Sequence, residues 1–185
     1  MKRLLVTAGE PAGIGPELCL TLAGSLSSAR QDAEIIIVAD MGLLQDRALQ
    51  LGLSIDFCYA SLEQSLTPTA HNQLKVLHVP LKVDSRAGHL DADNSAYVLN
   101  TLNIACDACL NGHADAMVTA PVHKGIINQA GTAFSGHTEY LQARCDVDQV
   151  VMMLTCDAMR VTLATTHLPL QDVAAAITTT GLSQT

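Results

Sequence analysis

Tryptophan is absent from the 185-residue sequence, and aromatic residues make up only 3% of it. Charged residues account for 15%, whereas apolar residues account for 49%. Disordered chains show the opposite balance. The sequence therefore predicts a folded protein with an aliphatic core, long enough for one domain or for one domain and part of a second.

Basic residues are also few. Ten Lys and Arg stand against 18 Asp and Glu, which gives a formal net charge of -8, and the only basic pair near either end is Lys2-Arg3. Duplex nucleic-acid binders carry a basic patch, so we expect no nucleic-acid partner and no binding to an anionic membrane surface. A small phosphorylated partner remains compatible with the acidic chain, because backbone amides act on phosphates at short range.

Long apolar runs are missing too. No stretch approaches the roughly 20 apolar residues of a membrane span. The apolar run near the N-terminus ends at Glu10 and is too short for a signal peptide. These features predict a cytoplasmic protein.

The six cysteines are too sparse for a small disulfide scaffold. Cys106 and Cys109 form a single C-x-x-C pair, which by spacing suits a redox pair or half of a zinc site. No second pair follows, and this one lies inside an apolar helical pattern. We therefore expect buried thiols on one face of a helix.

Short apolar runs alternate with segments of helical periodicity. The expected strands cover residues 4–7, 35–39, 53–59, 74–79, 116–119, 150–154 and 161–165. The expected helices cover residues 16–23, 43–51, 97–110, 124–128, 138–144 and 169–177, with Asp93 or Asn94 capping the third. This alternation predicts a layered α/β fold with a largely parallel sheet, whose ligands collect at the carboxyl ends of the strands. Residues 178–185 look like the start of a further element, so we expect a fragment of a longer protein.

A glycine-rich segment, GEPAGIGPE (residues 9–17), follows the first strand. Backbone N–H groups in such a loop suit phosphate or carboxylate binding. The segment is not a Rossmann fingerprint, because position 18 is Leu, and it lacks the Gly-Lys-Ser/Thr of a Walker A loop. A tight structural turn and a ligand loop are equally supported.

Three further polar segments carry histidine or lysine. Lys124 follows a strand and could neutralise a phosphate or carboxylate, although a solvated lysine is the simpler interpretation. His137 precedes Thr138, which could cap a helix, and an imidazole there could bind a phosphate; an incidental histidine is again simpler. His167 lies between a strand and a proline and could ligate a metal, but a catalytic zinc usually has three protein ligands.

Taken together, four segments resemble the 4-hydroxythreonine-4-phosphate dehydrogenase family of pyridoxine biosynthesis in order and spacing. They are GEPAGIGPE, TAPVHKGIIN, FSGHTEY, and VVMML followed by ATTHLPL. The resemblance implies a fold like that of isocitrate and isopropylmalate dehydrogenases, with two α/β subdomains around a cleft. It also implies a homodimer with the active site at the interface. Residues 1–185 are expected to form the N-terminal part, with no internal boundary assigned.

The resemblance also implies a reaction. Family members oxidise 4-phosphooxy-L-threonine with NAD, and loss of CO2 gives 3-amino-2-oxopropyl phosphate; a divalent metal (zinc, magnesium or cobalt) assists. His137 and Thr138 match substrate-binding positions, His167 matches the first of three metal-binding histidines, and Lys124 matches a segment lining the cleft. Members are longer, so the remaining metal ligands are expected beyond Thr185 and this chain is expected to be an incomplete enzyme.

Three alternatives stay open. A paralogous phosphothreonate dehydrogenase would use similar motifs on a related substrate. A non-catalytic module could hold a phosphorylated metabolite with the glycine loop and His137. A purely structural or interaction protein would leave the polar motifs at the strand ends unexplained.

Overall fold

The computed structural model describes residues 1–25 and 33–185. Within these, the chain divides into two compact units, Met1–Gly136 and His137–Thr185. The sequence pattern had given no internal boundary. Each unit is described by itself below.

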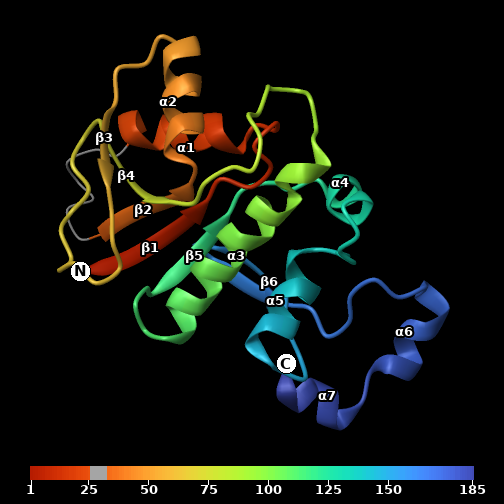
Figure 1. Cartoon of the computed structure of the whole chain (residues 1–185). Helices are drawn as coiled ribbons and strands as arrows, with labels where there is room; N and C mark the ends of the chain where they lie inside the picture. Colours follow the sequence, from red (N-terminus) through yellow and green to blue (C-terminus); the bar gives the residue numbers. More distant parts are fainter. Residues whose placement is uncertain (26–32) are drawn as a thin grey trace. The chain divides into compact units, whose positions relative to one another are not determined.

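The first unit is built on a five-stranded parallel sheet in the order β3-β4-β2-β1-β5 (Figure 1). The strands are β1 (Lys2–Thr7), β2 (Ala33–Ala39), β3 (Asp56–Tyr59), β4 (Gln73–His78) and β5 (Ala116–Thr119). The five expected strands of this unit are present, and β3 is shorter than expected. The α/β fold with a parallel sheet is therefore confirmed.

Both faces of this sheet are covered. Figure 1 shows α1 (Gly15–Ser25) and α2 (Met41–Gln50) on one side of the sheet and α3 (Ser95–Leu110) on the other. In β2, Ile35 and Ile37 belong to the core cluster under α1 and α2. Ile36, which lies between them, is equally buried. Because successive strand residues point to opposite faces, the continuous apolar run is what a doubly covered strand requires.

The start of α3 differs from the expectation. Asn94 occupies the position before the helix but makes no side-chain cap hydrogen bond. Its amide instead accepts from the Lys82 and Val83 N–H groups and donates to the Val83 carbonyl oxygen. Asp91 caps the short 3-10 turn η2 (Ala92–Asn94) by accepting from Asp93 N–H. The predicted cap was therefore wrong, because Asn94 is used to hold the preceding loop.

The cysteine pair lies on α3 as expected. Cys106 is buried and Cys109 is half-buried, and neither forms a disulfide bond. This agrees with the helix-face interpretation. None of the helices in the described ranges is long and apolar enough to cross a membrane.

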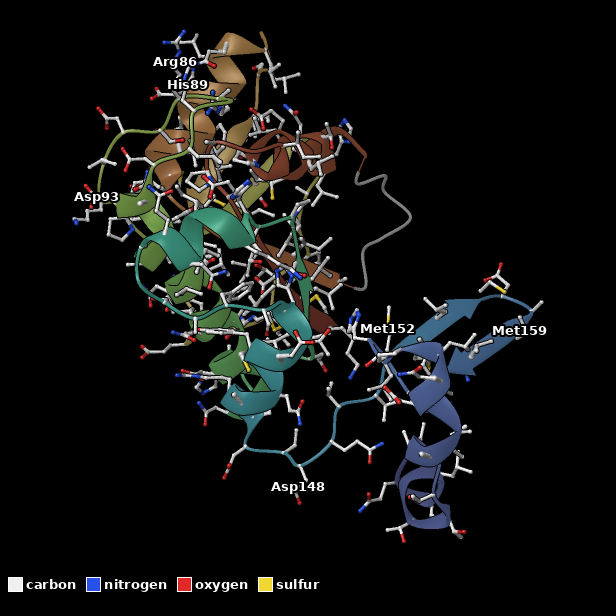
Figure 2. All side chains as sticks on the ribbon, turned by 90° about the vertical axis from the view of Figure 1, so that its right-hand side faces the viewer. Arg86, His89, Asp93, Asp148, Met152 and Met159 are labelled. Carbon is white, nitrogen blue, oxygen red and sulfur yellow. The ribbon has the colours of Figure 1, made fainter. Side chains whose placement is uncertain are left out.

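The second unit contains little buried surface. Its elements are α5 (His137–Cys145), β6 (Met153–Cys156), β7 (Met159–Thr162), α6 (Leu170–Ala176) and α7 (Thr179–Gln184). All residues of the antiparallel pair β6–β7 are exposed, and Figure 2 labels Met159, the first residue of β7, near the end of the hairpin. A two-stranded hairpin is marginally stable at best in water, so β6 and β7 contribute little stability by themselves.

Candidate functional site

The glycine-rich loop between β1 and α1 needs its glycines for close packing. Gly9 has a φ of 70°, and a Cβ there would collide with the Pro121 carbonyl oxygen. A Cβ on Gly15 would collide with the Ala8 carbonyl oxygen. Glycine at these two positions is therefore explained by the tight turn itself.

Two N–H groups of this loop donate hydrogen bonds to Glu10, which belongs to the same loop. Ala12 N–H donates to Glu10 Oε1 at 3.1 Å, and Gly13 N–H donates to the Glu10 carbonyl oxygen at 3.0 Å. The Glu10 residue is only 4% exposed, and this burial raises the pKa of its carboxyl group. Of the two interpretations of the loop, the structure favours the structural turn over a phosphate cradle.

This turn meets the segment that follows β5. Glu10 N–H donates to the Pro121 carbonyl oxygen at 3.0 Å, and Ala120 N–H donates to the Thr7 carbonyl oxygen at 3.0 Å. The carboxyl ends of β1 and β5 are thus joined by main-chain hydrogen bonds. Two of the four polar segments therefore lie together at the edge where α/β sheets bind ligands.

His123 and Lys124 begin the short helix α4 (Lys124–Gln129) at this edge. His123 is the N-cap, because its Nδ1 accepts a hydrogen bond from Ile126 N–H at 3.0 Å. Lys124 is exposed. The sequence places His123 and Lys124 together at the start of a short helix but predicts a role only for Lys124, because an imidazole is an unusual capping group.

A hollow of about 310 Å³ lies between α2 and the loop that follows β4. Two of the charged residues that line it are already engaged. Asp40 accepts from the N–H groups of Leu43 and Leu81, and Lys82 forms an ion pair with Asp93 at 2.8 Å. The hollow therefore offers less free charge to a phosphate than Lys124 does.

The other predicted site residues belong to the second unit. His137 is half-buried and is the first residue of α5, so Thr138 lies inside the first turn. The prediction that Thr138 caps this helix was wrong, because the helix begins one residue earlier. His167 is exposed, with a φ of 55°, in the loop between β7 and α6. The residue before Leu168-Pro169 is thus held in a backbone conformation that few side chains adopt.

The expected metal site has no complete set of ligands in the described ranges. No group of three or more His, Cys, Asp or Glu residues there could hold a metal ion. His167 contributes a single imidazole, whereas catalytic zinc takes three protein ligands. The described residues of this chain therefore do not fit a metal site by themselves.

A buried ionic cluster lies near the amino ends of the strands, away from this edge. Glu34 pairs with Arg3 and with Lys75, each at 2.7 Å. Burial raises the pKa of the Glu34 carboxyl group, but the hydrogen bonds from Lys75 and Arg3 outweigh burial and hold it below its ordinary value. Arg3 also donates to the carbonyl oxygens of Leu62 and Gln64. The cluster fastens the polar segment after β3 to the sheet and is structural.

Most of the chain is similar to one family of known proteins. The family described as pyridoxal phosphate biosynthetic protein PdxA matches residues 31–185. A relative from Marinobacter nauticus, named 4-hydroxythreonine-4-phosphate dehydrogenase, is 54% identical over 181 residues, which cover 98% of this chain and 52% of the relative. The chain therefore spans about half the length of the curated relatives that it matches.

Two solved structures share the fold. A 4-hydroxythreonine-4-phosphate dehydrogenase from Burkholderia phymatum has a TM-score of 0.89 at 23% identity, over 100% of this chain and 56% of that one. A terephthalate 1,2-cis-dihydrodioldehydrogenase from Burkholderia xenovorans LB400 has a TM-score of 0.72 at 19% identity, over 99% of this chain and 54% of that one. Because the family match covers most of its length, the chain belongs to the PdxA family of pyridoxal phosphate biosynthetic proteins.

Proposed function

We propose that this chain is part of an NAD-dependent enzyme that oxidises 4-phosphooxy-L-threonine and releases CO2 to give 3-amino-2-oxopropyl phosphate. The observation that carries the proposal is the 54% identity to a named 4-hydroxythreonine-4-phosphate dehydrogenase over 98% of this chain. The enzyme is proposed to act as a homodimer with its active site at the interface.

Three residues are proposed to contact the substrate. His137 and Thr138 place an imidazole and a hydroxyl group in the first turn of α5, where both can donate hydrogen bonds to phosphate oxygens. Lys124 supplies an ammonium group at the start of α4. Charge-assisted hydrogen bonds of this kind are stronger than neutral ones, which suits a doubly charged phosphate.

The proposed cofactors are NAD and a divalent metal such as zinc, magnesium or cobalt. The dehydrogenase name of the relatives supports a nicotinamide cofactor. His167 is proposed as one metal ligand, and at least one further ligand would have to come from outside the described residues. No step is assigned to the metal for that reason.

A paralogous activity on phosphothreonate is the second candidate. A structure with the same fold is named for a different substrate, terephthalate dihydrodiol. Fold alone therefore does not select the substrate, which must be decided by assay.

NADH formation tests the proposal. We would compare the 185-residue chain with a chimera that joins it to the part of the Marinobacter nauticus relative lying beyond the matched region. The substrates are 4-phosphooxy-L-threonine, 4-phosphothreonate and unphosphorylated 4-hydroxy-L-threonine, each with and without a chelator. NADH from 4-phosphooxy-L-threonine that the chelator abolishes supports the proposal, whereas NADH from 4-phosphothreonate alone establishes the paralogue.

A further inference from the structure

We propose that His123 is a further substrate-binding residue, which presents its Nε2–H group to an oxyanion of the substrate beside Lys124. The inference rests on the proposed function. Two observations support it. The His123 ring is oriented by a hydrogen bond, and the neighbouring N–H groups of Ala12 and Gly13 already bond to Glu10.

The ring is oriented by its hydrogen bond to α4. Nδ1 lies 3.0 Å from Ile126 N and accepts its N–H. A ring nitrogen that accepts carries no proton, so the neutral imidazole of His123 must hold its proton on Nε2. The cap therefore selects one tautomer and leaves Nε2–H as the available donor.

Gly125 makes room for this orientation. A Cβ at Gly125 would lie 3.1 Å from His123 Cε1 and 3.5 Å from Nδ1. The ring thus lies over the first turn of α4, at a spacing that a larger residue would disturb. The position of the His123 ring therefore explains why residue 125 is glycine.

Two polar groups are left available by these contacts. In the described parts of the chain, neither His123 Nε2 nor the Lys124 ammonium group has a hydrogen-bond or ion-pair partner, and both residues are exposed. They are neighbours at the carboxyl end of β5. The loop N–H groups of Ala12 and Gly13 are already used, whereas the side chains of His123 and Lys124 can still donate to an anion.

Glu10 is the carboxyl residue whose charge interacts with His123. It is buried beneath the loop, and burial raises the pKa of its carboxyl group. Its Oε1 is also bonded to Ala12 N–H.

Asparagine at position 123 separates a binding role from a capping role. His123→Asn keeps a side-chain oxygen that can accept from Ile126 N–H, because asparagine is a good N-cap, but it removes Nε2–H. In the chimera, the KM for 4-phosphooxy-L-threonine should rise about tenfold or more while urea unfolding stays at the wild-type midpoint. His123→Ala loses both functions and should change both measurements. A wild-type KM for His123→Asn would overturn the inference and leave His123 as a cap.

A measurement without turnover uses the 185-residue chain. Nitrogen-15 imidazole spectra should show His123 as the Nε2–H tautomer, and inorganic phosphate or acetate should shift its Nε2 resonance. A response to phosphate alone assigns the site to the substrate phosphate, and a response to acetate assigns it to the carboxylate. If the chimera makes no NADH but His123 responds, the site stands while the proposed reaction fails. The Nδ1–H tautomer, or no response to either anion, would overturn the inference.

Discussion

The side-chain amide of Asn128 holds the main chain of Phe134 from both sides. Its Oδ1 accepts from Phe134 N–H, and its Nδ2 donates to the Phe134 carbonyl oxygen, both at 2.9 Å. Nδ2 also donates to the Lys124 carbonyl oxygen at 2.9 Å. An amide is required, because only a group with one acceptor and two donors satisfies all three partners.

Asn128→Asp should therefore destabilise the first unit. The carboxylate loses both donors and faces two carbonyl oxygens, at a cost of about 2 kcal/mol in the free energy of unfolding. Urea unfolding of the chain measures this. Asn72→Asp is the matched control, because Asn72 donates one side-chain hydrogen bond, to the Ser54 carbonyl oxygen. An equal loss of unfolding free energy in the two variants would show that the three hydrogen bonds of Asn128 stabilise the fold no more than the single one of Asn72.

Glycine positions in α1 give a second matched pair. Gly15→Ala should cost about 1–3 kcal/mol, because its Cβ would collide with the Ala8 carbonyl oxygen. Gly24→Ala lies in the same helix with open space around the new Cβ, and should stabilise by about 0.5–1 kcal/mol. Thermal unfolding of both variants measures the difference. A neutral Gly15→Ala would contradict the close packing described for the loop.

Glu34 should make the first unit sensitive to acid. Its folded-state pKa lies below the unfolded value, so its contribution is fully present above the unfolded value of about 4.3 and is lost as the pH falls through the folded pKa. Glu34→Gln leaves Arg3 and Lys75 without their anionic partner and should cost about 3 kcal/mol at pH 7. Unfolding experiments between pH 7 and pH 3 should show the gap between variant and wild type narrowing. A constant gap would contradict the ion-pair account.

Ionisation of Glu10 should lower the stability of the folded state as the pH rises, which is the opposite of the effect of Glu34. Burial raises its folded-state pKa above the unfolded value, so the folded state loses stability as the pH rises through the folded pKa. Glu10→Gln keeps an acceptor for Ala12 N–H and removes the ionisation. The variant should therefore gain stability relative to the wild type on going from pH 4 to pH 7. A relative loss over that interval would show that the charged carboxylate is the stabilising form.

Local patterns predicted the sheet because they depend on residues close in sequence. The continuous run Ile35–Ala39 became the doubly covered strand β2, and the periodic residues 97–110 became most of α3. The meeting of the Gly9–Gly15 loop with the segment that follows β5 agrees with the rule that parallel strands share their carboxyl edge.

The long-range polar contacts could not be predicted in this way. Glu34 finds Arg3 31 positions away and Lys75 41 positions away, and no local spacing relates them. The strands of the hairpin were expected at residues 150–154 and 161–165, but they lie closer to the turn, at Met153–Cys156 and Met159–Thr162. The two-residue turn at Asp157-Ala158 pairs Cys156 with Met159, so the strands run directly up to the turn.

The roles of His137, Thr138 and His167 remain predictions, since they depend on a substrate and a metal. The most direct measurement is NADH formation from 4-phosphooxy-L-threonine by the chimera, with wild type and His137→Ala compared in one assay. The account predicts NADH from the wild type and a loss of about tenfold or more in kcat/KM for His137→Ala, since a hydrogen bond to a charged phosphate is removed. A folded wild-type chimera that makes no NADH, or a His137→Ala variant with wild-type kcat/KM, would contradict it.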